Sequence, residues 1–152
     1  MDKTVKAKIL SACTSNIRSE FVMFEKIRVL VGVDGSLQSK RALAEAITIV
    51  KHFSGFVKVV TVADKGSEEK AKATLSEVSR ELENECVAYE VALVLGSDAA
   101  KVLENVAKQE NFDLIVVGSR GLGGGVSMLL GSVSKKIVGS AYCNVLVVKS
   151  KR

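Results

Sequence analysis

A glycine-rich segment near the C-terminus is the part of this sequence best suited to hold a ligand. Residues 118–132 read Gly-Ser-Arg-Gly-Leu-Gly-Gly-Gly-Val-Ser-Met-Leu-Leu-Gly-Ser and contain six of the twelve glycines. Glycine permits positive φ and close approach of the backbone, so main-chain N–H groups can converge on an anion. Gly131 and Ser132 stand where a helix is predicted to begin, and a helix N-terminus favours phosphate. Together with the charge of Arg120, the segment predicts a phosphate site.

The spacing of these glycines excludes two common phosphate loops. No G-x-x-x-x-G-K-(S/T) sequence occurs, and Val126 stands where a G-x-G-x-x-G beginning at Gly121 needs its last glycine. The pattern that remains is Gly118, two residues, Gly121, nine residues, and then Gly131 with Ser132.

No catalytic group accompanies the segment. Ser132 lacks an identified general base, and the single histidine, His52, follows the apolar stripe of another predicted helix. The three cysteines, Cys13, Cys86 and Cys143, are far apart, which argues against a disulfide framework or a zinc knuckle and favours a reducing cytoplasm. We therefore expect no efficient catalysis, and the sequence indicates no metal ligands.

The elements that must position the segment follow from the order of the chain. From Lys26 onward, short β-rich runs alternate with longer stretches of helical period, which is typical of a parallel sheet covered by helices. The five predicted strands are Ile27–Val33, Phe56–Val62, about Val87–Leu95, Asp113–Val117 and Val145–Val148. Four helices are predicted beside them. Right-handed crossovers favour an α/β fold with an open doubly wound sheet, order 3-2-1-4-5, and helices on both faces.

The winding of such a sheet reverses between its first and fourth strands, and ligands bind at the carboxyl ends of the strands flanking that point. Asp34 and Ser36 follow the first strand, and the glycine-rich segment follows the fourth. Either residue could simply cap the next helix. The position of Asp34 at the reversal favours a ligand role.

The pattern of Gly118, Gly121 and Gly131-Ser132 resembles the nucleotide-binding signature of the universal stress protein family, G-x2-G-x9-G-(S/T). The resemblance covers residues 26–149 and includes Val-Asp-Gly-Ser after the first strand and the closing Val-Leu-Val-Val. It places the chain in the subset of the family that binds ATP, with Mg²⁺ or Mn²⁺ as candidate companion ions.

By the same resemblance, four residues would serve the base and the ribose. Val33 would wall the base, Asp34 would bond the ribose or lie beside the adenine, and Gly118 would lie near the ribose. The backbone of Val62, at the end of the second strand, would meet the adenine edge.

Five further residues would serve the phosphates. Arg120 and Gly121 would lie near them. Gly131, Ser132 and Val133 would bind them through main-chain N–H groups and the serine hydroxyl.

The resemblance implies an ATP-binding stress-response regulator that signals through nucleotide-dependent conformation, with at most slow ATP hydrolysis or self-phosphorylation. The alternative is a nucleotide-independent homodimeric adaptor that uses the same fold as an interaction surface. The family suggests a homodimer in which residues Val145–Val148 pair between subunits and cover an apolar sheet edge. An adenylating enzyme would need a Ser-Gly-Gly loop where Asp34-Gly35-Ser36 stands.

Two features depart from the family. The chain has no proline before its closing strand, and residues 1–25 form an N-terminal extension to a domain of residues 26–152, with Met23 as a candidate translation start.

A length of 152 residues suits one domain. The net charge of +5 is scattered without a stacking pattern of aromatic residues, so no nucleic-acid partner is expected. No apolar run reaches the ~18 residues of a membrane span, so no membrane partner is expected either.

Overall fold

The computed structural model describes residues 26–122 and 130–149. Residues 1–25, 123–129 and 150–152 lie outside the described residues, and with them the predicted N-terminal extension, the candidate start at Met23 and the middle of the glycine-rich segment. In the described ranges, no helix combines the length and the apolar character that crossing a membrane requires.

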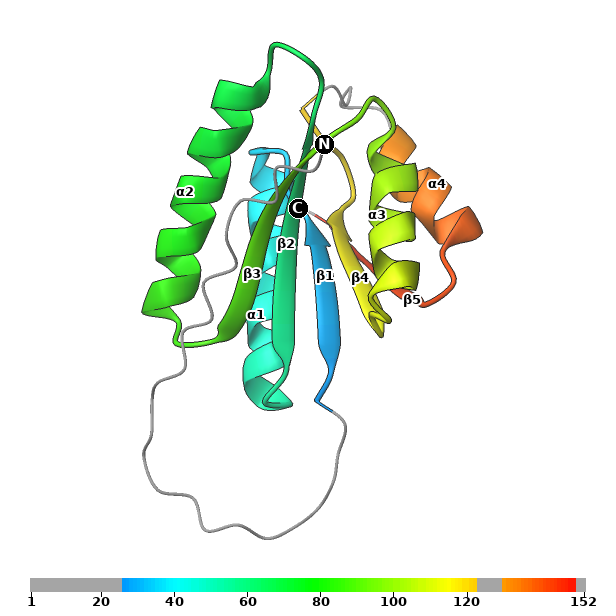
Figure 1. Cartoon of the computed structure of the whole chain (residues 1–152). Helices are drawn as coiled ribbons and strands as arrows, with labels where there is room; N and C mark the ends of the chain where they lie inside the picture. The colour runs from blue at the N-terminus through cyan, green and yellow to red at the C-terminus, as the bar shows by residue number, and fades with distance from the viewer. Residues whose placement is uncertain (1–25, 123–129, 150–152) are drawn as a thin grey trace, which may run out of the picture.

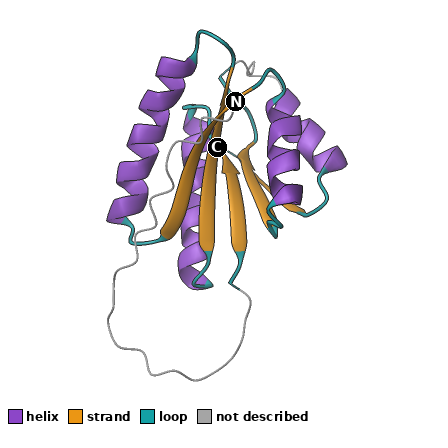
Figure 2. Ribbon diagram, viewed as in Figure 1, coloured by secondary structure: helices purple, strands orange, loops and turns teal. Residues whose placement is uncertain are grey.

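Five parallel strands alternate with four helices along the chain, and all the strand arrows point in the same direction (Figure 2). The strands are β1 (Arg28–Gly32), β2 (Phe56–Ala63), β3 (Ala88–Leu95), β4 (Leu114–Gly118) and β5 (Asn144–Val148). The helices are α1 (Leu37–His52), α2 (Glu68–Asn84), α3 (Ala99–Gln109) and α4 (Ser132–Ser140). The sheet has the order β3-β2-β1-β4-β5, which confirms the predicted fold class (Figure 1). Each strand boundary lies within one residue of its prediction.

The helices cover the two faces of the sheet in pairs (Figure 1). On one face, α1 and α2 pack residues such as Leu43 and Leu82 onto Val31 and Val59. On the other face, α3 and α4 pack Leu103 and Ile137 into a second cluster. Successive side chains of a strand point to opposite faces, so an interior strand with helices on both sides is apolar along most of its length.

One buried cation interrupts the apolar sheet. Lys58 of β2 is 8% exposed, and its Nζ lies 2.7 Å from Oε1 of Glu110 and 2.9 Å from Oε1 of Glu90. Burial by itself would lower the pKa of Lys58, but hydrogen bonds from its ammonium group to the two carboxylates raise that pKa above its ordinary value. The charged ammonium thereby joins β2, β3 and the C-terminal end of α3.

Replacing this cation tests its contribution to the fold. We expect Lys58→Met to lower the free energy of unfolding by about 1–3 kcal/mol, because Glu90 and Glu110 would be left close together without their counter-charge. Lys40→Met is the matched control, since Lys40 pairs with Glu77 at the surface and should matter by less than about 0.5 kcal/mol. Chemical denaturation measures both changes, and equal effects would contradict a special role for Lys58.

Candidate functional site

A cavity of about 690 Å³ opens at the carboxyl ends of the strands, where the direction of winding reverses. It lies over β1 and β4, which are hydrogen-bonded neighbours with Val31 opposite Val116. The nine residues that the sequence assigns to a nucleotide all line it: Val33, Asp34, Val62, Gly118, Arg120, Gly121, Gly131, Ser132 and Val133. Four elements and their loops thus bring the predicted residues together around one space.

At one end of the cavity, β2 runs past the end of β1. The N–H of Val33 donates to the carbonyl of Val60 at 3.0 Å, so the main chain of Val60 faces β1. Alternate residues of a strand present their main-chain groups to the same side, so Val62 also faces that side. Because the ladder between β1 and β2 ends at Gly32 and Val60, the N–H and C=O of Val62 are directed beyond β1. They form a donor and acceptor pair at the cavity wall.

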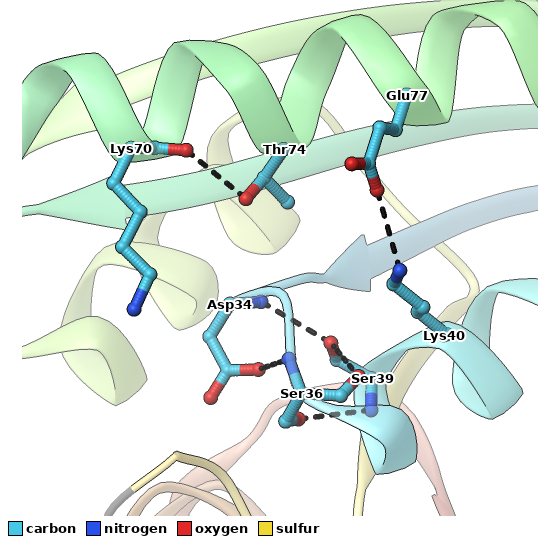
Figure 3. Close-up of polar contacts among 7 residues, drawn as sticks. All are labelled: Asp34, Ser36, Ser39, Lys40, Lys70, Thr74 and Glu77. Atoms are coloured by element: carbon cyan, nitrogen blue, oxygen red, sulfur yellow. Dashed lines mark hydrogen bonds and ion pairs between the residues drawn. The ribbon is translucent and has the colours of Figure 1, made fainter.

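Asp34 follows β1 and joins the two loops that flank the cavity. Figure 3 shows its bond to Ser36 in the first of these loops. Its Oδ1 accepts a hydrogen bond from the N–H of Ser36 at 2.9 Å, and its Oδ2 accepts one from the N–H of Leu122 at 3.0 Å. Burial would raise the pKa of Asp34, but hydrogen bonds from Ser36, Leu122 and Ser39 outweigh it and leave the pKa below its ordinary value. The carboxylate is therefore charged at neutral pH.

The turn that carries Asp34 is held in place by two helices. Ser36 caps α1 by accepting a hydrogen bond from the N–H of Ser39 at 3.2 Å. Gly35 has φ of +84°, and a Cβ there would meet Oγ1 of Thr74 on α2 at 3.2 Å. Figure 3 shows α2 above this turn, with Lys40 of α1 paired to Glu77. A residue with a side chain would be strained at position 35 in two ways.

At the other end of the cavity, α4 begins without a side-chain cap. Gly131 is its N-cap residue and offers no side chain to the helix. The first intrahelical bond runs from the N–H of Lys135 to the carbonyl of Gly131 at 3.0 Å. The N–H groups of Ser132 and Val133 have no hydrogen-bond partner among the described residues. The free N–H groups of such a helix start can donate hydrogen bonds to an anion.

The N–H of Gly131 has a different role from the one the sequence suggests. It donates to the carbonyl of Ser119 at 2.7 Å, and the same carbonyl accepts a hydrogen bond from Oγ of Ser134 at 3.1 Å. These bonds close the glycine-rich loop at its base. Gly131 lines the cavity, but its N–H is committed to the loop, so only Ser132 and Val133 of this trio keep main-chain N–H groups free of a partner among the described residues.

The three signature glycines are required by close packing. Positive φ is found at Gly35 and Gly66 but not at Gly118, Gly121 or Gly131. A Cβ on Gly118 would lie 2.7 Å from the carbonyl carbon of Gln38, and one on Gly121 would lie 2.5 Å from Oδ2 of Asp34. One on Gly131 would lie 3.3 Å from Cα of Arg120. Positive φ therefore does not explain these three glycines, and each instead lies close to other atoms of the protein.

Several cavity residues were not anticipated from the sequence. Ala99 and Leu103 come from α3, and Lys135 comes from the first turn of α4. Gly32 admits Leu103, because a Cβ at position 32 would lie 2.7 Å from its Cδ1. The signal for Lys135 was available, since it stands three residues after Ser132 on the same predicted helix.

The charges on the cavity wall suit an anion. Arg120 and Lys135 are cationic, and Asp34 is the one carboxylate among the lining residues that the structure describes. Within residues 26–122 and 130–149, no cluster of three histidine, cysteine or acidic side chains could hold a metal ion.

Comparison with known proteins identifies the family. The model of the universal stress protein family matches residues 27–149. The chain belongs to the universal stress protein family. A universal stress protein of Methanocaldococcus jannaschii is 31% identical over 155 residues, which covers 91% of this chain and 89% of that protein.

Solved structures share the fold of this universal stress protein. A universal stress protein in complex with cAMP has a TM-score of 0.70 and 28% identity, and the match covers 83% of this chain and 98% of that one. The Archaeoglobus fulgidus universal stress protein in complex with dAMP has a TM-score of 0.69 and 22% identity, with 83% and 100% covered.

The packing of this universal stress protein around Gly118 can be tested with a matched pair of variants. Gly118→Ala should lower the free energy of unfolding by about 1–3 kcal/mol, because its Cβ would collide with the backbone of Gln38. Gly139→Ala lies within α4, where a Cβ meets nothing within 4 Å, and should be neutral or raise that free energy by up to about 1 kcal/mol. Denaturant titration decides, and equal stability of the two variants would contradict the close approach.

Proposed function

We propose that this universal stress protein binds ATP in the cavity between β1 and β4 and acts as a stress-response regulator. One observation carries the proposal: the cavity has a main-chain donor and acceptor pair at Val62 and an uncapped helix N-terminus at Ser132. A ligand that satisfies both ends needs a flat polar edge at one end and negative charge at the other. An adenine nucleotide has both.

The adenine would lie between apolar side chains at the β2 end. Val33, Val62 and Leu103 line this part of the cavity and would cover the faces of the base. The main-chain groups of Val62 would bond the edge of the adenine, which carries an amino donor beside a ring-nitrogen acceptor. Asp34, charged and directed into the same cavity, would accept a hydrogen bond from a ribose hydroxyl.

The phosphates would lie at the start of α4. The N–H groups of Ser132 and Val133, together with the hydroxyl of Ser132, are donors for phosphate oxygens. The helix dipole adds partial positive charge at the same point, and Arg120 lines the wall nearby. Mg²⁺ or Mn²⁺ would enter with the triphosphate, because such ions are commonly held by phosphate oxygens and water.

The relatives support an adenine nucleotide. The 28% identical structure contains cAMP, and the Archaeoglobus fulgidus structure contains dAMP. The proposal that the nucleotide is ATP rests on the hydrogen-bond donors at the phosphate end of this cavity.

The same geometry favours binding over rapid hydrolysis. Asp34 is the one lining carboxylate that the structure describes, and its lowered pKa makes it a poor proton acceptor. His52, the single histidine, ends α1 about 20 Å along that helix from Ser39. We therefore propose that ATP serves mainly as a signal and that hydrolysis or self-phosphorylation is slow at most. The hydrogen bond between Asp34 and the N–H of Leu122 would link a nucleotide bound at Asp34 to the conformation of the glycine-rich loop.

We further propose that the protein acts in the cytoplasm, where thiols stay reduced.

A proline at position 132 would remove one phosphate donor while keeping the helix. Proline is well tolerated at the first helical position, and Gly131 has φ −73° and ψ 167°, which suits a residue before proline. We expect Ser132→Pro to weaken ATP binding about tenfold or more, since a hydrogen bond to a charged phosphate is lost. Calorimetry on the nucleotide-stripped full chain with ATP and Mg²⁺ measures the change.

Ser132→Ala is the control, because it removes the hydroxyl and retains the N–H. It should weaken binding less than Ser132→Pro does. Equal ATP affinity in Ser132→Pro and the unmodified chain would argue against phosphate at α4. Absence of any saturable ATP binding by the unmodified chain would instead favour the nucleotide-independent adaptor.

We further propose that two copies of the chain pair through β5, an edge strand of the sheet. The N–H of Ser119 donates to the carbonyl of Val148 at 2.8 Å, so the main chain of Val148 faces β4. By alternation, the main-chain groups of Val145 and Val147 face outward and are available to another strand. An apolar edge of this kind is normally covered, and a second copy of β5 would cover it.

Proline at position 147 tests this pairing without breaking the sheet. Val147→Pro removes an outward N–H and no bond to β4, and proline is tolerated in edge strands. We expect light scattering to report a dimer for the unmodified chain and for Val147→Ala, and a monomer for Val147→Pro. A monomeric unmodified chain, or a dimeric proline variant, would contradict pairing through this edge.

A further inference from the structure

The first turn of α4 and the residue after it carry positive charge, which is unfavourable near the N-terminus of a helix. Like the first turns of α1 and α3, this turn contains no acidic residue, whereas α2 begins with Glu68 and Glu69. Lys135 and Lys136 stand instead at the fourth and fifth positions of α4. Cations near the positive end of the helix dipole lower stability unless an anion is present to offset them.

The two lysines have different partners. Nζ of Lys136 lies 3.1 Å from Oδ2 of Asp98, the residue that caps α3, so its charge is neutralised by a neighbouring helix. Lys135 forms no ion pair with any residue that the structure describes, and it lines the cavity. Side chains on a helix lean toward its N-terminus, which directs the ammonium of Lys135 toward Ser132 and the space in front of it.

The position of Lys135 differs from that of the other phosphate donors. Ser132 and Val133 offer fixed main-chain groups at the tip of the helix, which can meet the phosphate nearest the ribose. Lys135 lies nearly one turn further along and bears its charge on a long flexible stem. Its reach suits phosphates that extend beyond those bound by the main chain.

We propose that Lys135 makes the cavity select nucleotides by the length of the phosphate chain, favouring the triphosphate over the monophosphate. This inference rests on the proposed function, since it concerns the same cavity. Lys135 acts as a specificity-determining residue that contacts the outer phosphates. Its unfavourable place beside the helix dipole becomes favourable when a polyphosphate lies at the N-terminus of α4.

Lys135 should affect the stability of the nucleotide-free chain and its preference for longer phosphate chains in opposite directions. Removing the cation should relieve the repulsion from the helix dipole in the nucleotide-free chain. The same change should remove an attraction for the outer phosphates. A residue with a merely structural role would not move these two quantities in opposite senses.

The test compares Lys135→Gln and Lys135→Glu with Lys136→Gln. Calorimetry on the nucleotide-stripped full chain gives the affinities for adenosine, AMP and ATP. We expect Lys135→Gln to lower the ratio of ATP to AMP affinity about three- to tenfold, as for a solvent-accessible ion pair, and Lys135→Glu to lower it further. Lys136→Gln should leave the ratio within about twofold, and adenosine affinity should be unchanged in all three variants.

Thermal unfolding of the nucleotide-free proteins supplies the second readout. Lys135→Glu places an acidic residue near the start of α4 and should raise Tm by about 1–4 °C. An unchanged ratio in Lys135→Gln and Lys135→Glu, with nucleotides still bound, would overturn the inference and leave the proposed function standing. Failure of the unmodified chain to bind any of the three ligands would overturn the proposed function, and this inference with it.

Discussion

The hydrogen-bonded pairing of β1 with β4 is the constraint on which the site depends. Val29 lies opposite Leu114 and Val31 opposite Val116, although two strands and three helices separate β1 from β4 in the chain. Their pairing places the loop of Asp34 beside the glycine-rich loop. The absence of a Cβ at Gly118 then lets β4 end against the first turn of α1, so that Asp34 can reach the N–H of Leu122. A shift of register between the strands would separate these groups.

The helices differ in whether a side chain caps their N-termini. Ser36 caps α1 and Asp98 caps α3, each through a side-chain oxygen that accepts a main-chain N–H. An N-cap bond of this kind typically contributes about 1 kcal/mol. At α4 the N-cap residue is Gly131, which makes no such bond, and the first turn carries cations. The start of α4 therefore lacks a stabilising bond that the starts of α1 and α3 have, and the N–H groups of Ser132 and Val133 are left available at the cavity.

The sequence was sufficient for the strand order, because hydrophobic alternation is a local signal. The nine nucleotide-site residues came from the resemblance to the family, and all nine line the cavity. It could not show contacts that depend on how helices approach one another across the sheet. Ala99 and Leu103 enter the cavity from α3, and Leu103 does so only because Gly32 has no Cβ. Local backbone geometry was also hidden. After α1 the positive φ of 50° falls on Ser54 and not on the neighbouring Gly55, where a Cβ would meet the carbonyl oxygen of Ile27 at 2.5 Å.

The carbonyl of Ser119, just after the end of β4, is a fixed point from which the glycine-rich segment begins. It receives hydrogen bonds from the N–H of Gly131 and the hydroxyl of Ser134, while the N–H of Ser119 is bonded to Val148. Both ends of residues 120–130 are therefore anchored by atoms outside that segment. The entropy of closing a loop changes only slowly with its length, so insertions between the anchors would cost the fold little. The sheet itself therefore places little constraint on the length of this segment, and the positions of Gly121 and Gly131 are set by their close contacts with Asp34 and Arg120.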